Sequence, residues 1–276
     1  MVTFPNAKIN IGLSITRRRE DGYHDLETLF YPIDLCDVLE IVPTKNNETT
    51  LTITGIAVDG DIEKNLVMRA YRLLQSQYNL PAVDINLHKV IPFGAGLGGG
   101  SADAAFTLKM LRDMFALPLN DEQLAGMASN LGADCPFFIY NRPLIATGIG
   151  DCFASTEFSL KGKFIILVKP SIAVSTAEAY AGVTPQVPQK SLNEKLSSAI
   201  DTWRNEVVND FERASSRHIL ALLLSSNDYT IWGLYMLRCR ARDHRYSAFS
   251  ISPITLQAVS PTVLYGRANA TYRLTL

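Results

Sequence analysis

The sequence has almost no net charge, few cysteines and no long apolar run. Its 26 Lys and Arg residues nearly balance 27 Asp and Glu residues, which leaves a net charge of −1. This balance argues against nucleic acid or a membrane surface as a partner, because both attract strongly basic proteins. No apolar run reaches the length of a membrane span, and the N-terminus lacks the pattern of a signal peptide. We therefore expect a cytoplasmic protein without nucleic-acid or membrane partners.

The four cysteines also exclude one kind of site. Cys36, Cys135, Cys152 and Cys239 are scattered without the spacing of metal ligands. This pattern favours reduced, buried thiols in a cytosolic protein. We assign no metal-ligating side chain. The remaining composition, with 47% hydrophobic and 19% charged residues, is that of a globular protein with one large domain or two small ones.

What the sequence does have is a dense glycine stretch between Pro92 and Ala105. Five glycines fall within seven residues, at Gly94, Gly96, Gly98, Gly99 and Gly100. The alternating stretch 83–90 before them predicts a strand, and apolar residues at helical spacing after them predict a helix. Glycine allows unusual backbone angles and the close approach of a ligand. A helix start offers unpaired N–H groups and a positive partial charge, so the stretch predicts a phosphate-binding loop.

The glycine spacing alone does not identify the ligand. Gly94, Gly96 and Gly99 satisfy the dinucleotide pattern G-x-G-x-x-G, which is weak by itself. The P-loop pattern is missing because no Gly-Lys-Ser/Thr follows the glycines. The alternative, a glycine-rich turn without a ligand, would weaken the fold without compensation.

Four further polar positions are candidates, each with an ordinary structural alternative. Lys8 and Asn10 share one face of a predicted strand and could simply be its solvated side. Asn65 precedes a predicted helix and could be a polar first-turn residue. Asp134, between a helix end and the apolar run Pro-Phe-Phe, is expected to be partly buried and could form a structural salt bridge.

The sequence from Arg17 to Phe30 reads as a charged loop, in which a Tyr-His pair is usually incidental. Strands are expected over 33–42, 51–56 and 161–169, and a helix is expected after Asp61. A second helical stripe includes Leu124 and Leu131. Apolar residues at helical spacing predict one more helix over 192–211.

Taken together, the motifs resemble those of the GHMP kinases, a family of small-molecule kinases. Pro92 to Ser101 matches the family's second signature, P-x-G-x-G-L-G-S/G-S/G-S. Residues 5–13 resemble the first signature, P-A-K-x-N-x-x-L, with Asn6 inserted between the Pro and the Ala. Gly132-Ala133-Asp134-Cys135-Pro136-Phe137-Phe138 resembles the segment that carries the family's catalytic aspartate.

The resemblance implies ATP and Mg²⁺ as cofactors and assigns roles to particular residues. Asp134 is the catalytic carboxylate, and the Lys8 ammonium beside it keeps it ionised. Asp134 then accepts or orients the hydroxyl proton of the substrate during attack on the γ-phosphorus. Asn65 binds adenine. The residues implied around the ATP phosphates, with the Ser101 hydroxyl near the metal or the phosphates, are Pro92, Gly94, Gly96, Leu97, Gly98, Gly99, Gly100, Ser101 and Ala102.

The stretch R-x-D-G-Y-H-x-L-x-T-L-F, from Arg19 to Phe30, resembles one branch of the family. That branch phosphorylates the 2-hydroxyl of 4-diphosphocytidyl-2-C-methyl-D-erythritol in the non-mevalonate isoprenoid pathway. The resemblance implies this substrate as the small-molecule partner. An aromatic ring can stack on a pyrimidine and an imidazole can hydrogen-bond its edge. The implied substrate-binding residues, with Tyr180 on the second face of the cytosine, are Asn10, Tyr23, His24, Thr176 and Tyr180.

The implied fold is α+β in two domains. The first, residues 1–158, is an ATP-binding domain like domain 2 of ribosomal protein S5, and the second, residues 159–276, is ferredoxin-like. We expect a monomer or a weak homodimer.

The resemblance covers about residues 5–213 and then stops. The family's third glycine signature, of the G-S-G-S type, is missing, and Gly233 and Gly266 are the only later glycines. A basic surface segment is one interpretation of 237–245. However, back-translation shifted by two bases permits Y-D-M-G-A-L-Y-A-S-L-S-G-S-G-S-P-V-F-G-I-F from Asp228 onward. We therefore hypothesise that the tail from about Ala214 is a frameshift product, natural or from a sequencing error.

This hypothesis has consequences for the second domain and for activity. We expect an incomplete C-terminal sheet with exposed apolar edges, and impaired or absent activity of this chain. Two rival functions remain: a GHMP kinase for another small alcohol, and a degenerate nucleotide-binding protein. The Gly22-Tyr23-His24 stretch argues against the first, and the missing third signature favours the second.

Overall fold

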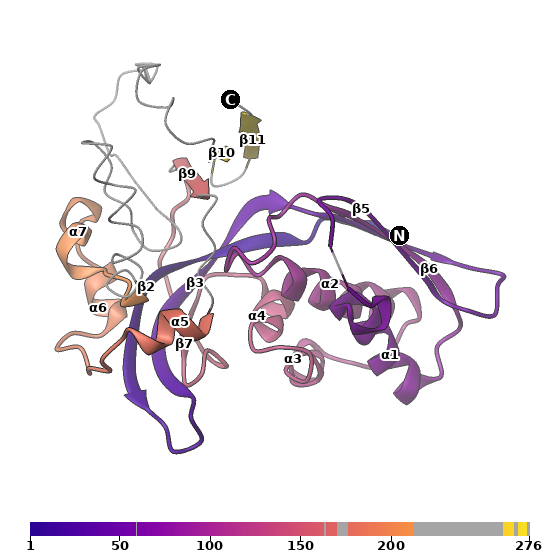
Figure 1. The fold of residues 1–276 in the computed structure, drawn as a ribbon, viewed down its shortest axis with the longest axis horizontal. Coiled ribbons are helices and arrows are strands. Elements are labelled where there is room, and N and C mark those ends of the chain that lie inside the picture. The colour runs from indigo at the N-terminus through magenta and orange to yellow at the C-terminus, as the bar shows by residue number, and fades with distance from the viewer. Residues whose placement is uncertain (59, 163, 170–175, 212–261, 268–269, 275–276) are drawn as a thin grey trace. The chain divides into compact units, whose positions relative to one another are not determined.

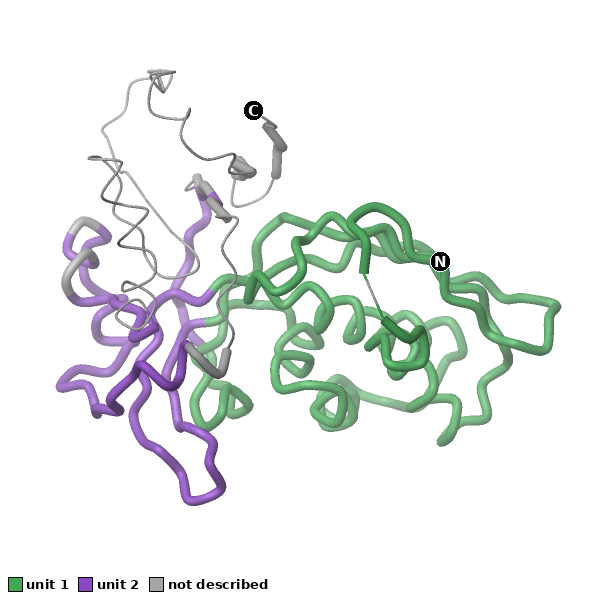
Figure 2. Tube along the Cα trace, viewed as in Figure 1, with its two compact units in different colours: residues 1–9, 30–155 green, residues 10–29, 156–276 purple. Residues whose placement is uncertain are grey.

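The computed structural model describes residues 1–58, 60–162, 164–169, 176–211, 262–267 and 270–274. The chain forms two compact units (Figure 2). Unit 1 contains residues 1–9 and 30–155, and unit 2 contains residues 10–29 and 156–276. The sequence therefore leaves unit 1 after Ile9 and returns to it at Phe30. The expected boundary after residue 158 lies close to the one at 155, whereas residues 10–29 group with unit 2.

A four-stranded sheet with the order β1-β4-β6-β5 forms one layer of unit 1. The strands are β1 (Val2–Thr3), β4 (Val38–Pro43), β5 (Thr50–Gly55) and β6 (Val83–Lys89). β6 pairs antiparallel with β4 and parallel with β5. Alternate side chains of β6, Val83, Ile85 and Leu87, are buried, which confirms the strand predicted before the glycine stretch.

Helices form the second layer of unit 1 (Figure 1). They are η1 (Ile62–Lys64), α1 (Leu66–Tyr78), α2 (Gly99–Met114), α3 (Asp121–Ala128) and α4 (Cys135–Tyr140). The connection from β5 through α1 to β6 lets two neighbouring strands run parallel. Buried side chains of α1 and α2 join those of the sheet in one continuous core. The helices predicted after the glycines and around Leu124 are both present.

A second sheet with the order β2-β3-β7-β8 begins as a long hairpin. Its strands are β2 (Asn6–Arg18), β3 (His24–Cys36), β7 (Leu144–Thr147) and β8 (Cys152–Ser155). The outer halves of β2 and β3 and the turn between them belong to unit 2. Asp37 separates β3 from β4, so the single strand expected over 33–42 is two strands.

Unit 2 contains short helices and a three-stranded antiparallel sheet. The helical elements are α5 (Thr176–Ala181), α6 (Leu192–Leu196), η2 (Ile200–Thr202) and α7 (Trp203–Glu206). The sheet has the order β11-β10-β9, from β9 (Phe164–Lys169), β10 (Thr262–Arg267) and β11 (Ala270–Leu274). The tail thus supplies two strands, and β10 pairs with β9 along its length. We expected an incomplete sheet with exposed apolar edges, and β10 covers one edge of β9.

The single helix expected over 192–211 is also wrong in detail. Ser191 caps α6 through a reciprocal capping box with Glu194, and the helix stops at Leu196. After α7 the chain forms a parallel bridge from Asn209 to Leu13 of β2. Asp210 fixes this arrangement because its Oδ2 accepts a hydrogen bond from the N–H of Ile15 at 2.7 Å. Tertiary contacts with β2 therefore end the helical pattern.

Candidate active site

The glycine stretch forms a loop between the end of β6 and the start of α2. Three of its glycines have left-handed backbone angles, with φ of 63° at Gly94, 60° at Gly96 and 71° at Gly98. Only glycine adopts this conformation readily. Gly98 is the N-cap of α2 and forms no side-chain cap. The first helical hydrogen bond runs from Ala102 N to Gly98 O, at 2.8 Å. The N–H groups of the first turn are therefore outside the helical ladder and suit an anion.

Packing beneath the loop requires glycine at two positions. A Cβ at Gly98 would lie 2.8 Å from Phe138, and a Cβ at Gly99 would lie 2.8 Å from Ile91. Leu97 is buried, and its carbonyl accepts a hydrogen bond from Lys8 N at 2.9 Å. Phe93, in contrast, is 73% exposed at the start of the loop. The loop is thus anchored from below while its outer side remains accessible.

Lys8 and Asp134 form an ion pair beside this loop. Lys8 Nζ lies 3.5 Å from Asp134 Oδ2, with side-chain exposures of 6% and 34%. The ammonium also lies 4.7 Å from the centre of the Phe30 ring. A Cβ at Gly98 would be 3.3 Å from Lys8 Cγ, so the pair and the start of α2 are close neighbours. The structure brings together the two residues that the sequence assigned to catalysis.

Asp134 is not used as a helix cap. It occupies the N-cap position of α4, but its side chain forms no cap hydrogen bond. Its carboxylate is partly exposed and held near Lys8. A carboxylate in this position can accept or orient a hydroxyl proton.

Ser101 and Ala102 begin α2 but differ in environment. Ser101 hydrogen-bonds to Cys135, next to Asp134, and burial raises the pKa of the Cys135 thiol to about 11. Ala102 is buried in the core, and its N–H is already bonded to Gly98. Ser101 can reach a ligand through its hydroxyl, whereas the structure gives Ala102 a packing position.

Asn65 is the N-cap of α1. Its Oδ1 accepts a hydrogen bond from Val67 N at 2.9 Å, which leaves the amide NH₂ as the group that could bind adenine. A Cβ at Gly100 would lie 3.7 Å from Leu66 Cδ1, so the starts of α1 and α2 are neighbours. An Asn directly before a periodic apolar run is itself a cap signal, and the sequence interpretation did not use it.

The residues assigned to the cytosine lie in unit 2. Tyr23, in the turn between β2 and β3, is 62% exposed. His24 opens β3 and stacks on Tyr180, with ring centroids 4.9 Å apart and 22° between the planes. Tyr180 also meets the Phe211 ring edge-on, with ring centroids 4.8 Å apart. Two rings in direct contact leave no room for a base between them, so the cytosine cannot lie between His24 and Tyr180 in this arrangement.

The other two proposed substrate residues lie on separate elements, β2 and α5. Asn10 is half-buried on β2. Thr176 is the first residue of α5. The tail residues 214–261, on which the frameshift hypothesis rests, lie outside the described residues.

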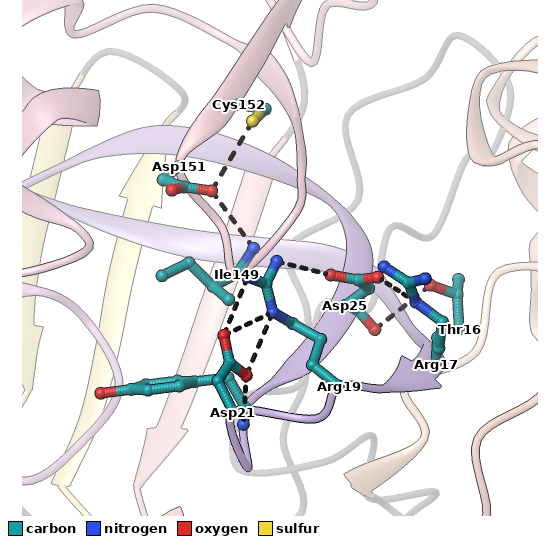
Figure 3. Close-up of polar contacts among 9 residues, drawn as sticks. Thr16, Arg17, Arg19, Asp21, Asp25, Ile149, Asp151 and Cys152 are labelled. Atoms are coloured by element: carbon teal, nitrogen blue, oxygen red, sulfur yellow. Dashed lines mark hydrogen bonds and ion pairs between the residues drawn. The ribbon is translucent and has the colours of Figure 1, made fainter.

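Sequence reasoning missed a charged network that supports the turn around Tyr23 (Figure 3). Arg19 donates to Asp21 at 3.0 Å and to Asp25 at 3.3 Å, and Arg17 donates to Asp25 at 2.7 Å. The side-chain hydrogen bond from Arg19 lowers the pKa of Asp21, and that from Arg17 lowers the pKa of Asp25. Asp21 Oδ1 also accepts from Tyr23 N at 3.0 Å. The alternating charges of this stretch were the available signal.

A second charged cluster, also missed, is buried behind the glycine loop. Lys89 forms ion pairs with Asp37 and with Asp103, the latter at 2.6 Å. Burial lowers the pKa of the Lys89 ammonium, but the two carboxylates outweigh burial and raise it above its usual value. Burial raises the pKa of Asp103 to about 7, and the charge of Asp37 adds to this rise. An aspartate in the small-residue stretch after the glycines was the only sequence signal.

Two negative findings apply to the described part of the chain. It contains no group of three or more His, Cys, Asp or Glu side chains placed to hold a metal ion. None of its helices is long and apolar enough to cross a membrane.

The family described as GHMP kinases N terminal domain matches residues 65–142. The chain is 52% identical over 214 residues to 4-diphosphocytidyl-2-C-methyl-D-erythritol kinase from Parabacteroides distasonis, covering 78% of each chain. It is 51% identical over 216 residues to the protein of the same name from Bacteroides fragilis, covering 78% of this chain and 79% of that one.

Solved structures agree with the sequence comparison. A crystal structure of 4-(cytidine 5'-diphospho)-2C-methyl-D-erythritol kinase superposes with a TM-score of 0.67 at 32% identity, over 82% of this chain and 81% of that one. The mevalonate kinase of Methanococcus jannaschii superposes with a TM-score of 0.54 at 18% identity, over 82% and 80% of the two chains, which shows a shared fold.

Proposed function

Because this chain belongs to the 4-diphosphocytidyl-2-C-methyl-D-erythritol kinases, a branch of the GHMP kinases, we propose that it transfers the γ-phosphoryl group of ATP to the 2-hydroxyl of 4-diphosphocytidyl-2-C-methyl-D-erythritol. The observation that carries the proposal is the Lys8–Asp134 pair beside the N-terminus of α2. It joins a carboxylate that can handle a proton to a loop that suits phosphates.

The proposed reaction uses these residues in the following way. The glycine loop and the first N–H groups of α2 bind the ATP phosphates. The substrate hydroxyl oxygen attacks the γ-phosphorus, its proton goes to or is oriented by the Asp134 carboxylate, and the bond to the bridging oxygen of ADP breaks. Lys8 keeps the carboxylate in place through the ion pair and adds positive charge near the transferred group.

Mg²⁺ would accompany ATP and offset the charge of its phosphates. The Ser101 hydroxyl is an oxygen donor of the kind that Mg²⁺ accepts, and it lies in the first turn after the glycines. Asn65 would bind adenine through its amide NH₂ group. Pro92 and the backbone of residues 94–102 would surround the phosphates, with Ala102 supporting the helix start from the core.

The cytidyl group of the substrate would bind in unit 2. We assign the exposed Tyr23 ring to stacking on the cytosine, and a ring nitrogen of His24 to hydrogen bonding with the edge of the base. Tyr180 would cover the second face of the base, and one face of its own ring lies against His24. Asn10 and Thr176 stay proposed substrate contacts.

A second candidate function is nucleotide binding without phosphoryl transfer. The missing third glycine signature in the tail favours it for this particular chain. The two candidates differ in one observable, because the second predicts ATP binding without product. The monomer or weak homodimer and the cytoplasmic location stay predictions.

One experiment separates these candidates. ATP-dependent phosphorylation of the cytidyl substrate would be measured for this chain and for a version with the reading frame restored after residue 213. We expect turnover from the restored version and weak or no turnover from this chain. Equal turnover would show that the tail is a functional ending. No turnover from either version would contradict the proposed substrate. Other small alcohols would then be tested as phosphoryl acceptors with ATP.

A further inference from the structure

The buried charged cluster behind the glycine loop has no part in the proposed reaction. It consists of Asp37, Lys89 and Asp103, whose side chains are 0%, 5% and 3% exposed. The three residues come from the junction between β3 and β4, the last position of β6 and the first turns of α2. We call this cluster the loop clamp. Its single ammonium binds two carboxylates.

The loop clamp holds the entry to the glycine loop. Asp37 Oδ1 accepts hydrogen bonds from Val90 N at 2.5 Å and from Ile91 N at 2.8 Å. These two residues directly follow β6 and lead into the loop. Ile91 in turn packs beneath Gly99, where a Cβ would come within 2.8 Å of its side chain. Asp37 therefore fixes the backbone on which the loop begins.

The loop clamp also holds the exit of the loop. Lys89 Nζ bonds to Asp103 Oδ2 at 2.6 Å. The same ammonium lies 3.4 Å from the position that a Cβ would take at Gly99, the first residue of α2. Because Lys89 also binds Asp37, one side chain connects both ends of the loop. The separation of these ends determines where the loop places its N–H groups.

The composition of the loop clamp suggests that it has a role besides stabilising the fold. Burying one cation with two carboxylates costs desolvation energy, and apolar replacements of buried ion pairs are often neutral or stabilising. Asp103 Oδ1 is buried without a hydrogen-bond partner among the described residues, an additional cost. A cluster retained for stability alone would gain by being replaced with apolar side chains.

We propose that Lys89, held by Asp37 and Asp103, is a positioning residue that sets the conformation of the glycine loop for the phosphates of ATP. This inference rests on the proposed function, because it takes ATP as the ligand of the loop. The three side chains of the loop clamp are buried, at 0% to 5% exposure. It acts through the backbone of residues 90–91 and through the start of α2.

The test is a double variant, Lys89→Met with Asp103→Leu, compared with the unaltered chain. It removes one buried cation and one buried anion together, and it leaves Asp37 bonded to two backbone N–H groups. ATP binding in the presence of Mg²⁺ would be measured by titration calorimetry, which does not depend on turnover. We expect the Kd for ATP to rise at least tenfold, while the Kd for the cytidyl substrate stays within twofold.

Lys109→Met is the matched control. Lys109 is a partly buried lysine of α2, the helix that carries Asp103, and its ammonium donates to Ile139 O at 3.1 Å. This change should leave the Kd for ATP within twofold of the unaltered chain. A change as large as that of the double variant would contradict the proposal, because loss of any partly buried lysine near the core would then have the same effect.

Other outcomes are also decisive. If the double variant is folded and binds ATP like the unaltered chain, the loop clamp is structural only and the proposal is wrong. If the double variant does not fold, Asp103→Asn decides, because it keeps the shape and an oxygen acceptor for Lys89. That variant should raise the Kd for ATP about threefold, and an unchanged Kd overturns the proposal. If the unaltered chain binds no ATP, the proposed function fails together with this inference.

Discussion

Two charged clusters support two loops of this molecule, one in each unit. The loop clamp of Asp37, Lys89 and Asp103 lies behind the glycine loop of unit 1 and is almost completely buried. The Arg17, Arg19, Asp21 and Asp25 network supports the turn around Tyr23 in unit 2 and is largely exposed. Both hold a backbone segment through carboxylates that accept from N–H groups. They differ mainly in their access to water.

This difference determines what each cluster can do. Exposed ion pairs are screened by water and salt, so they contribute little to stability. Buried charges cannot be left unpaired without a large desolvation cost. The glycine loop, where the phosphoryl group would be transferred, therefore has a stiff support. The Tyr23 turn, which would bind the cytosine, has a weaker one.

The largest expected effect is on the catalytic pair of unit 1. Asp134→Asn keeps the shape of the side chain but removes the carboxylate that accepts or orients the hydroxyl proton. We expect kcat to fall by about 10² to 10⁴, the usual contribution of a positioned acid or base. The measurement is single-turnover transfer of phosphate from ATP to the cytidyl substrate, in whichever version of the chain is active. ATP affinity is the control and should stay within a few-fold, and an unchanged kcat would remove Asp134 from the mechanism.

The second largest expected effect is on the free energy of unfolding, and it tests the buried cluster. Lys89→Met leaves the Asp37 and Asp103 carboxylates together without a cation. We expect the free energy of unfolding to fall by roughly 3–5 kcal/mol, the cost of breaking a buried ion pair. Urea unfolding followed by circular dichroism would measure it. Arg19→Met is the comparison in the exposed network and should leave the urea midpoint unchanged, and equal losses in the two variants would remove the contrast between the clusters.

The free energy of unfolding should also depend on pH through the buried cluster, which gives a further test of the contrast between the buried and the exposed charges. Burial raises the pKa of Asp103 from its ordinary value near 4 to about 7. The folded state therefore favours the protonated carboxyl. Its contribution to stability is complete below about pH 4 and is lost as the pH rises to about 7.

Asp103→Asn is neutral at every pH and lacks this contribution. We therefore expect the unfolding free energy of the unaltered chain, relative to that of Asp103→Asn, to decline between pH 4 and pH 7 and then level off. Urea midpoints at four or five pH values would show it. Two parallel curves would mean that Asp103 does not hold a proton in this range.

Local patterns explain which parts of this structure could be predicted. The alternation of 83–89 and the helical spacing after Gly99 identified β6 and α2, because each signal is contained in a short stretch. The Lys8–Asp134 pair came from family motifs, since no local pattern links residues so distant in the sequence. The loop clamp was missed for the same reason, because its three residues come from separate elements and each resembles an ordinary polar position.

Periodicity also failed where tertiary contacts override it. The apolar residues from Leu192 to Phe211 have helical spacing, yet the chain leaves the helix to pair with β2 at Leu13. The stack of His24 on Tyr180 could not be predicted either. The sequence motifs assigned both residues to the cytosine, but they give no distance between the two rings. Spacing predicts which residues share a face, but it does not predict which of them touch.

The smallest expected effect lies in the exposed network of unit 2. Asp21→Asn weakens the ion pair with Arg19 but keeps an oxygen that can accept from Tyr23 N. Asp21→Ala removes both contacts. If the turn positions Tyr23 for stacking on the cytosine, the alanine variant should raise the KM for the cytidyl substrate by about threefold to tenfold, while kcat and the KM for ATP stay constant. The asparagine variant should retain most of the affinity, because the hydrogen bond to the backbone fixes the turn and the ion pair is screened by water. Steady-state kinetics at low and high salt would separate the two contacts, and equal losses in both variants would show that charge, not the backbone hydrogen bond, holds the turn.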